Sequence, residues 1–272
     1  MSAAIGIDVG GSKSLGVLVD EQGAVLAERR TPTPRTADAL LACLGDLVAS
    51  LGPGAPGCPV GVGVPGLVDR DGVLRFTPNL PGVVEVPVRA FLERHEHGPF
   101  VVLNDATGAM WAELTRGAAV GALDGVMATI GTGIGGGVVL GGELVGGHHG
   151  FAGEFGHMVV DPSGPACPCG KRGCWERYAS GSGLAWLARE AAAAGAAGRV
   201  LELAGGALGD VRGEHVTTAA AEGDADALAV VDRFAWWLGL GLANLAAVLD
   251  PELIVLGGGL IEAGAVLLEP TL

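Results

Sequence analysis

The chain has 272 residues and a formal net charge of −14, from 16 basic and 30 acidic side chains. It contains no basic block, so the electrostatic footprint of a nucleic-acid-binding protein is missing. The start MSAAIGIDVGG lacks the basic and apolar regions of a signal peptide, so we expect a cytoplasmic protein whose thiols stay reduced.

The first half of the chain predicts alternating strands and helices. Predicted strands lie at residues 4–9, 14–20, 24–30, 60–64 and 100–103. The first three form a meander joined by tight turns. Apolar residues at helical spacing predict a helix over 37–51, with Thr36 as its N-cap, and a further helix begins directly after Asp105. This order predicts the α/β class.

A weak internal sequence repeat predicts two related α/β lobes. Residues 7–19 align with 128–140, so that Gly10 matches Gly131 and Gly16 matches Gly137. Each segment reads as a strand, a Gly-rich turn and a returning strand. Backbone N–H groups of such turns can converge on a phosphate. Residues 131–136 also fit the G-x-G-x-x-G pattern, but a strand and a turn follow in place of a helix, so a Rossmann site for NAD is disfavoured.

The longest apolar run, residues 234–249, is too short to span a bilayer and contains Asn244. We therefore expect a buried core helix here and no membrane partner.

One His and three Cys lie close together at His157, Cys167, Cys169 and Cys174. One nitrogen and three sulfurs suit a tetrahedral zinc ion with no open position for a reactive water, so this zinc would be structural. A reduced cluster without metal and a disulfide are the alternatives, and the expected compartment disfavours the disulfide. Cys43 and Cys58 read as ordinary structural residues.

Seven motifs occur in an order that resembles the ROK family of repressors, open reading frames and sugar kinases. They are DVGGSK (8–13), PNLPG (78–82), LNDATGAMWAE (103–113), GTGIGGG (131–137), GEFGH (153–157), CPCGKRGCWE (167–176) and DPELIVLGGG (250–259). The segment CWERYASG is most similar to that of actinobacterial-type glucokinases in this family. The resemblance implies a two-lobed actin/hexokinase-like (ribonuclease H-like) fold, with ATP and a hexose in the interlobe cleft. The lobes would comprise residues 1–107 and 108–272, in a homodimer or homotetramer.

The resemblance also implies roles for individual residues. Asp105, which by itself could simply cap a helix, would be the general base that accepts the proton of the attacking sugar hydroxyl. The implied sugar contacts are Asn79, Asn104, Asp105, Glu154, His157 and Glu176. The implied nucleotide contacts are Gly10, Gly11, Ser12, Lys13, Thr132 and Gly133, with Gly257, Gly258 and Gly259 near the adenosine. Asp8 would act on Mg²⁺ through water, or would only satisfy loop amides; Lys13 would meet phosphate or remain solvated.

The chain departs from the family pattern in three places. Ser12 stands where Thr is usual, Thr107 stands where Asn is usual, and the chain stops at Leu272 where family members continue through further helices. We therefore expect the C-terminal helices of the family to be missing from this chain.

The expected reaction is ATP-dependent phosphorylation of a hexose, with glucose converted to glucose 6-phosphate. The alternatives are an N-acetylmannosamine or N-acetylglucosamine kinase, and a catalytically impaired sugar-binding ROK protein. A ROK repressor would need a winged helix-turn-helix before the first strand. ATP is the expected donor because polyphosphate-using relatives generally lack the Cys cluster. Loss of the metal should raise the hexose KM far more than the ATP KM, because the phosphate loops lie elsewhere in the sequence.

Overall fold

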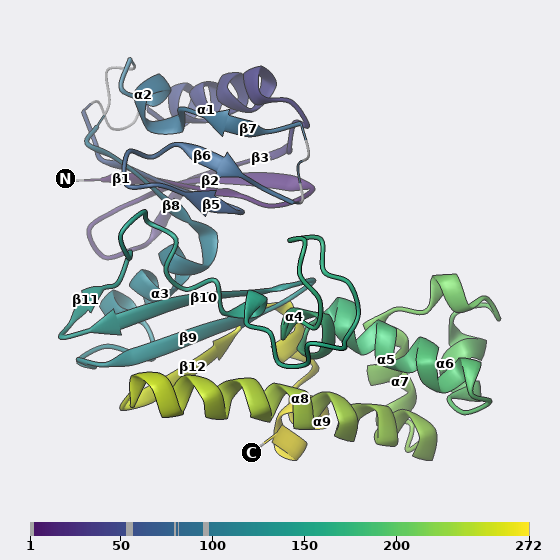
Figure 1. The fold of residues 1–272 in the computed structure, drawn as a ribbon. Coiled ribbons are helices and arrows are strands. Elements are labelled where there is room, and N and C mark those ends of the chain that lie inside the picture. The colour runs from purple at the N-terminus through teal and green to yellow at the C-terminus, as the bar shows by residue number, and fades with distance from the viewer. Residues whose placement is uncertain (1–2, 53–56, 79, 81, 95–97, 272) are drawn as a thin grey trace. The chain divides into compact units, whose positions relative to one another are not determined.

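The computed structural model describes residues 3–52, 57–78, 80, 82–94 and 98–271, which form two compact units (Figure 1). The first unit comprises Met1–Ala112 and Leu144–Ala152, and the second comprises Glu113–Glu143 and Gly153–Leu272. The boundary between the two units thus falls inside helix α3 (Asp105–Arg116), and a short later segment returns to the first unit. Helical periodicity continues across this point, so the sequence pattern carries no mark of the boundary.

The first unit is built on a five-stranded sheet with the strand order β3-β2-β1-β4-β8. Its elements are β1 (Ala4–Val9), β2 (Lys13–Val19), β3 (Val25–Pro32), α1 (Ala37–Leu51), β4 (Val60–Val64), β5 (Leu67–Val68), β6 (Leu74–Phe76), β7 (Val84–Val86), α2 (Val88–Leu92), β8 (Phe100–Asn104) and the first part of α3. Strands β1 to β3 form the predicted antiparallel meander, and β1, β4 and β8 run parallel. The five predicted strands and both predicted helices are confirmed.

Helix α1 packs on the meander through a continuous apolar face. Its buried residues include Leu44, Leu47 and Leu51. A Cβ at Gly16 of β2 would lie 2.9 Å from Leu51 Cδ1, so glycine at this position lets the helix and the strand pack closely without a shift of that leucine. Thr36 occupies the predicted N-cap position, but its hydroxyl makes no capping hydrogen bond.

The second unit repeats the topology of the first on a four-stranded sheet with the order β11-β10-β9-β12. Its elements are β9 (Gly125–Ile130), β10 (Ile134–Leu140), β11 (Glu143–Leu144), η2 (Phe155–His157), α4 (Glu176–Ala179), α5 (Gly181–Ala193), α6 (Gly198–Leu203), η3 (Leu208–Asp210), α7 (Gly213–Ala221), α8 (Ala225–Leu249), β12 (Leu253–Gly257), η4 (Gly259–Ala263), α9 (Ala265–Leu268) and η5 (Glu269–Thr271). Strand β10 is antiparallel to β9 and β12 is parallel to it, as β2 and β4 are to β1. The internal repeat is therefore present in the topology. Because residues 134–140 form strand β10 in place of a helix, the Gly-rich turn at 131–136 is not a Rossmann turn.

Helix α8 contacts α5 and α7 with one face only. Phe234 and Leu238 are buried, whereas Trp236 is 61% exposed and Val248 is 79% exposed. The expected core helix is therefore present but buried on one face only, because apolar residues also occupy its solvent face. In the described part of the chain, no helix is long and apolar enough to cross a membrane.

Candidate functional site

Asp8 and Asp105 meet at the edge of the first sheet where the parallel strands end. Asp8 is in register with Gly63 of β4, and Gly63 is in register with Leu103 of β8. Asp105 follows two residues later, and a Cβ at Gly63 would lie 3.5 Å from its Cα. Parallel strands present their carboxyl ends at one edge of a sheet, which is where α/β proteins place ligands.

Asn104 and not Asp105 provides the main cap of helix α3. The Asn104 Oδ1 accepts hydrogen bonds from the backbone N–H groups of Ala106 at 2.9 Å and Thr107 at 3.1 Å. Its Nδ2 donates to the carbonyl of Gly66 at 3.1 Å, which fixes the amide orientation. Asp105 is the first residue of the helix, and its Oδ1 also accepts from Ala106 at 2.9 Å. The Asp105 carboxylate is thus positioned at a helix N-terminus without being needed as the sole cap.

The pKa of Asp105 is raised above the ordinary value for an aspartate. Desolvation is the main cause, the negative charge of Asp8 adds to it, and the hydrogen bond from Ala106 opposes both. The pKa of Asp8 is raised as well, because surrounding atoms partly desolvate its carboxyl although the residue as a whole stays exposed. A raised pKa makes the ionised carboxylate of Asp105 a stronger base than an ordinary aspartate.

The first Gly-rich turn closes between β1 and β2. The Gly10 N–H donates to the Lys13 carbonyl at 2.9 Å, and a Cβ at Gly10 would lie 2.8 Å from that oxygen. Gly11, Ser12 and Lys13 are exposed. Glycine at position 10 is therefore required by the turn itself. Asn79, a predicted sugar contact of the same unit, lies outside the described residues.

The two Gly-rich segments of the second unit lie together at one end of its sheet. Gly257 of β12 is opposite Thr129 of β9, and Gly258 has a φ of 92°. A Cβ on Gly258 would lie 2.5 Å from the carbonyl oxygen of Ile130, the residue just before the turn at Gly131. The structure therefore brings the predicted adenosine segment and the predicted phosphate turn side by side. A 3-10 helix, η4, follows Gly258.

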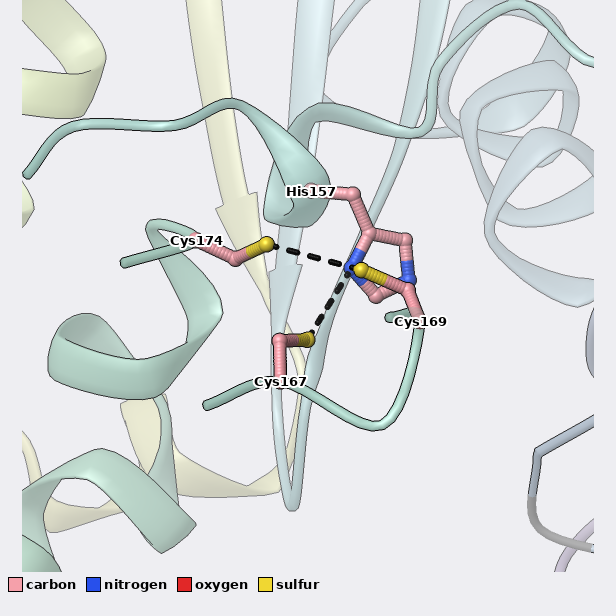
Figure 2. Close-up of side chains that lie close together, drawn as sticks. All are labelled: His157, Cys167, Cys169 and Cys174. Atoms are coloured by element: carbon pink, nitrogen blue, oxygen red, sulfur yellow. Dashed lines mark hydrogen bonds between the residues drawn. The ribbon is translucent and has the colours of Figure 1, made fainter. Parts of the chain in front are cut away.

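Four predicted metal ligands converge in the second unit (Figure 2). One potential ligand atom from each of His157, Cys167, Cys169 and Cys174 lies within 4.8 Å of all the others. The Cys169 and Cys174 sulfurs are 3.6 Å apart, and Cys167 Sγ is 3.7 Å from His157 Nδ1. A tetrahedral ion with metal–sulfur bonds of ~2.3 Å requires sulfur atoms about 3.8 Å apart, so the donor set fits zinc.

The electrostatics of the cluster also suit a cation. Desolvation and the neighbouring sulfurs raise the pKa of Cys174 to about 12. Several thiolates in one small volume need a positive charge, which a divalent metal would supply. The cluster is held by backbone hydrogen bonds from Cys167 to Lys171 at 2.8 Å and from Trp175 to Met158 at 2.8 Å. The second bond joins the chain after Cys174 to the segment that carries His157.

Glu154 and Glu176 flank this cluster. Glu154 directly precedes η2, the turn that carries His157, and Glu176 begins α4 two residues after Cys174. The Glu176 Oε2 accepts a hydrogen bond from the backbone N–H of Ile134 at 3.0 Å. Although the phosphate loop lies elsewhere in the sequence, a side chain of the Cys-rich segment is therefore hydrogen-bonded to the end of that loop.

Two residues that support the site, Tyr178 and Ser182, could not be identified from the sequence motifs. Tyr178 donates a hydrogen bond to Asp161 Oδ2 at 2.7 Å and stacks on Trp237 with ring centroids 4.0 Å apart. Ser182 Oγ donates to the Thr132 carbonyl at 2.8 Å. The hydrogen-bond partners of Tyr178 and Ser182 lie 17 and 50 positions away along the chain, so no local sequence pattern indicates them.

The sequence model of the ROK family matches residues 4–271. The chain belongs to the ROK family. It is 38% identical to the glucokinase of Streptomyces coelicolor, over 99% of this chain and 86% of that protein. An N-acetylmannosamine kinase of Escherichia coli O1:K1 is 37% identical over 97% of this chain and 86% of that protein. The crystal structure of a ROK family glucokinase from Streptomyces griseus, in complex with glucose and AMPPNP, superposes with a TM-score of 0.84 at 38% identity, covering 99% of this chain and 87% of that one.

Proposed function

We propose that this ROK protein transfers the γ-phosphoryl group of ATP to a hexose and that glucose is its principal acceptor, giving glucose 6-phosphate. The observation that carries the proposal is Asp105, a carboxylate with a raised pKa at the carboxyl ends of the parallel strands β1, β4 and β8. Its orientation is fixed by the start of α3 and by Asn104. Glucokinase relatives at 38% identity support glucose as the acceptor.

A sugar hydroxyl is a weak nucleophile at neutral pH. In the proposed reaction the carboxylate of Asp105 accepts the hydroxyl proton as the sugar oxygen attacks the γ-phosphorus, and the bond to the β–γ bridging oxygen breaks so that ADP leaves. General base catalysis of this kind contributes about 10²- to 10⁴-fold. When bound, Mg²⁺ with ATP supplies charge neutralisation at the transferred phosphoryl group. Asp8 lies near enough to Asp105 to raise its pKa, and we assign it to orient water around that cation.

The remaining assignments divide between acceptor and donor. Asn104, Glu154, His157 and Glu176, with Asn79, would contact the sugar. Backbone groups of the turns at Gly10–Lys13 and Thr132–Gly133 would hold the phosphates, and Gly257–Gly259 would lie by the adenosine. His157 faces Cys167 through Nδ1, which leaves Nε2 for a sugar hydroxyl. Zinc in the cluster would hold the segments that carry Glu154, His157 and Glu176, and it would take no part in phosphoryl transfer.

A hexosamine acceptor is the second candidate, because an N-acetylmannosamine kinase is nearly as similar to this chain as the glucokinases are. The two acceptors differ at C2, where an acetamido group replaces a hydroxyl. A coupled assay of ADP release over glucose, mannose, N-acetylglucosamine and N-acetylmannosamine decides between them. We expect the highest kcat/KM with glucose. A higher kcat/KM with either acetamido sugar would identify that sugar as the principal acceptor in place of glucose. If none of the four sugars led to ADP release, the kinase proposal would be rejected.

We further propose a homodimer or homotetramer that works in the cytoplasm. Light scattering of the purified protein tests the assembly, and a monomer at micromolar concentration would contradict it.

A further inference from the structure

The turn between β9 and β10 is held from one side by the segment that follows the Cys/His cluster. Within the turn, the Gly131 N–H donates to the Gly133 carbonyl at 3.0 Å. The Gly131 carbonyl accepts from the Gly181 N–H at 2.8 Å, and the Thr132 carbonyl accepts from Ser182 Oγ at 2.8 Å. The Glu176 Oε2 accepts from Ile134 at 3.0 Å. Contacts from residues 176–182 thus fix the start, the middle and the end of the turn.

Glu176 also sets the residue type at position 133. A Cβ built on Gly133 would lie 2.3 Å from Glu176 Oε2 and 3.0 Å from its Cδ. The carboxylate therefore covers the Cα of Gly133, and a side chain there would displace it. Glycine at 133 is required by the Glu176 contact, whether or not a phosphate approaches the turn.

Glu176 is itself fixed by its surroundings. Its backbone carbonyl accepts a hydrogen bond from the buried Ser180 hydroxyl at 2.7 Å, and that hydroxyl also caps α5 by accepting from Gly183 at 3.1 Å. The neighbouring Trp175 is fully buried, and its Nε1 donates to the Trp237 carbonyl at 2.8 Å. Glu176 is thus attached to the Cys/His cluster on one side and to the α-helical core on the other.

We propose that Glu176 is a positioning residue for the donor side: it holds the Gly131–Ile134 turn in the shape that receives the nucleotide phosphates. The inference rests on the proposed function, and it assigns Glu176 a task separate from its sugar contact. One carboxylate oxygen fixes the turn and the other remains for the acceptor. The Cys/His cluster, through Glu176, then supports both substrates.

The first experiment measures nucleotide binding in the absence of any hexose. Titration calorimetry with AMPPNP and Mg²⁺ on Glu176→Ala should show an affinity about tenfold weaker than that of the wild type, because a charged hydrogen bond to the turn is lost. Ser182→Ala removes a second clamp on the turn and should weaken AMPPNP binding while leaving the hexose affinity unchanged. Glu190→Ala, which removes an exposed carboxylate from α5, is the matched control and should bind AMPPNP as the wild type does.

A double-mutant cycle between Gly133→Ala and Glu176→Ala tests the contact itself. If the Gly133 substitution acts by displacing Glu176, its effect on AMPPNP affinity should largely disappear once Glu176 is alanine. Equal effects of Gly133→Ala in both backgrounds would overturn the proposal, and so would wild-type AMPPNP affinity in Glu176→Ala and Ser182→Ala. Failure of the wild type to bind AMPPNP would instead reject the proposed function. Melting curves and zinc content identify a variant that has lost its fold, and Ser182→Ala then carries the test.

Discussion

At the scale of single residues, the neighbourhood of Asp105 defines the proposed chemistry. Asn104 supplies the main cap of helix α3, so the Asp105 carboxylate is not required for capping and can accept a proton. The sequence motif identified Asp105 correctly as a residue at a strand end, but it could not assign the cap, because Asn and Asp are equally good at that position. Only the hydrogen bonds distinguish the two side chains.

The pH dependence of kcat/KM should reflect the raised pKa of Asp105. A general base must be ionised, so activity is lost as the pH falls through this pKa, and the acid limb should lie above the range of an ordinary aspartate. Asp8→Asn removes a negative charge that raises this pKa, so the limb should move to lower pH. Asp71→Asn, at an exposed carboxylate, is the control and should leave the limb in place. A limb unmoved by Asp8→Asn, or moved to higher pH, would contradict the assignment of that charge.

At the scale of elements, the strands and the Gly-rich turns could be predicted because their signals are local. Strand alternation and the turns at Gly10 and Gly131 gave the meander and the repeat of topology. The exposed face of α8 could not be predicted in this way, because Trp236 and Val248 look like core residues whichever face they occupy. The contact of Glu176 with Ile134 spans forty-two positions and has no local signal.

The contact between α8 and the Cys-rich segment predicts different stability changes at two glycines of this helix. A Cβ at Gly241 would lie 1.9 Å from the fully buried Trp175 ring, so Gly241→Ala should lower the free energy of unfolding by ~1–3 kcal/mol through overpacking. At Gly239 on the same helix, the nearest atom to a new Cβ is Thr271 O at 3.7 Å. Gly239→Ala should therefore be neutral or add up to ~1 kcal/mol, as alanine favours helix over glycine. Urea unfolding of both variants measures the difference; equal changes would show that the Trp175 contact does not limit position 241.

At the scale of the whole molecule, the chain consists of two units with related sheets, and the predicted site residues are shared between them. Asp8, Gly10 and Asp105 belong to the first unit, and Glu154 and Glu176 to the second. The ordered motifs indicated the family and the α/β class, since each motif carries several residues at fixed spacing. The boundary between the two units has no mark in the sequence pattern, because α3 runs through it.

Metal loss should affect the protein as a whole. Cys169→Ser should remove the zinc that the wild type holds at about one ion per chain, and it should lower the Tm because a metal bound only by the folded state stabilises that state. The KM values for hexose and ATP should both rise, since Glu176 connects the cluster to the phosphate turn. Cys43→Ser, at a half-buried thiol of α1, is the control and should retain the zinc. An unchanged zinc content in Cys169→Ser, measured by elemental analysis, would contradict the ligand assignment.

The most direct test of the central claim is the turnover of Asp105→Asn compared with its hexose binding. Asparagine keeps the shape of the side chain and can still accept from the Ala106 N–H, but it cannot take up the hydroxyl proton. We predict a kcat at least about 10²-fold below the wild type in a coupled ADP-release assay. The hexose affinity, measured by calorimetry, should stay within a few fold of the wild-type value. A variant that keeps more than about a tenth of the wild-type kcat would contradict general base catalysis by Asp105.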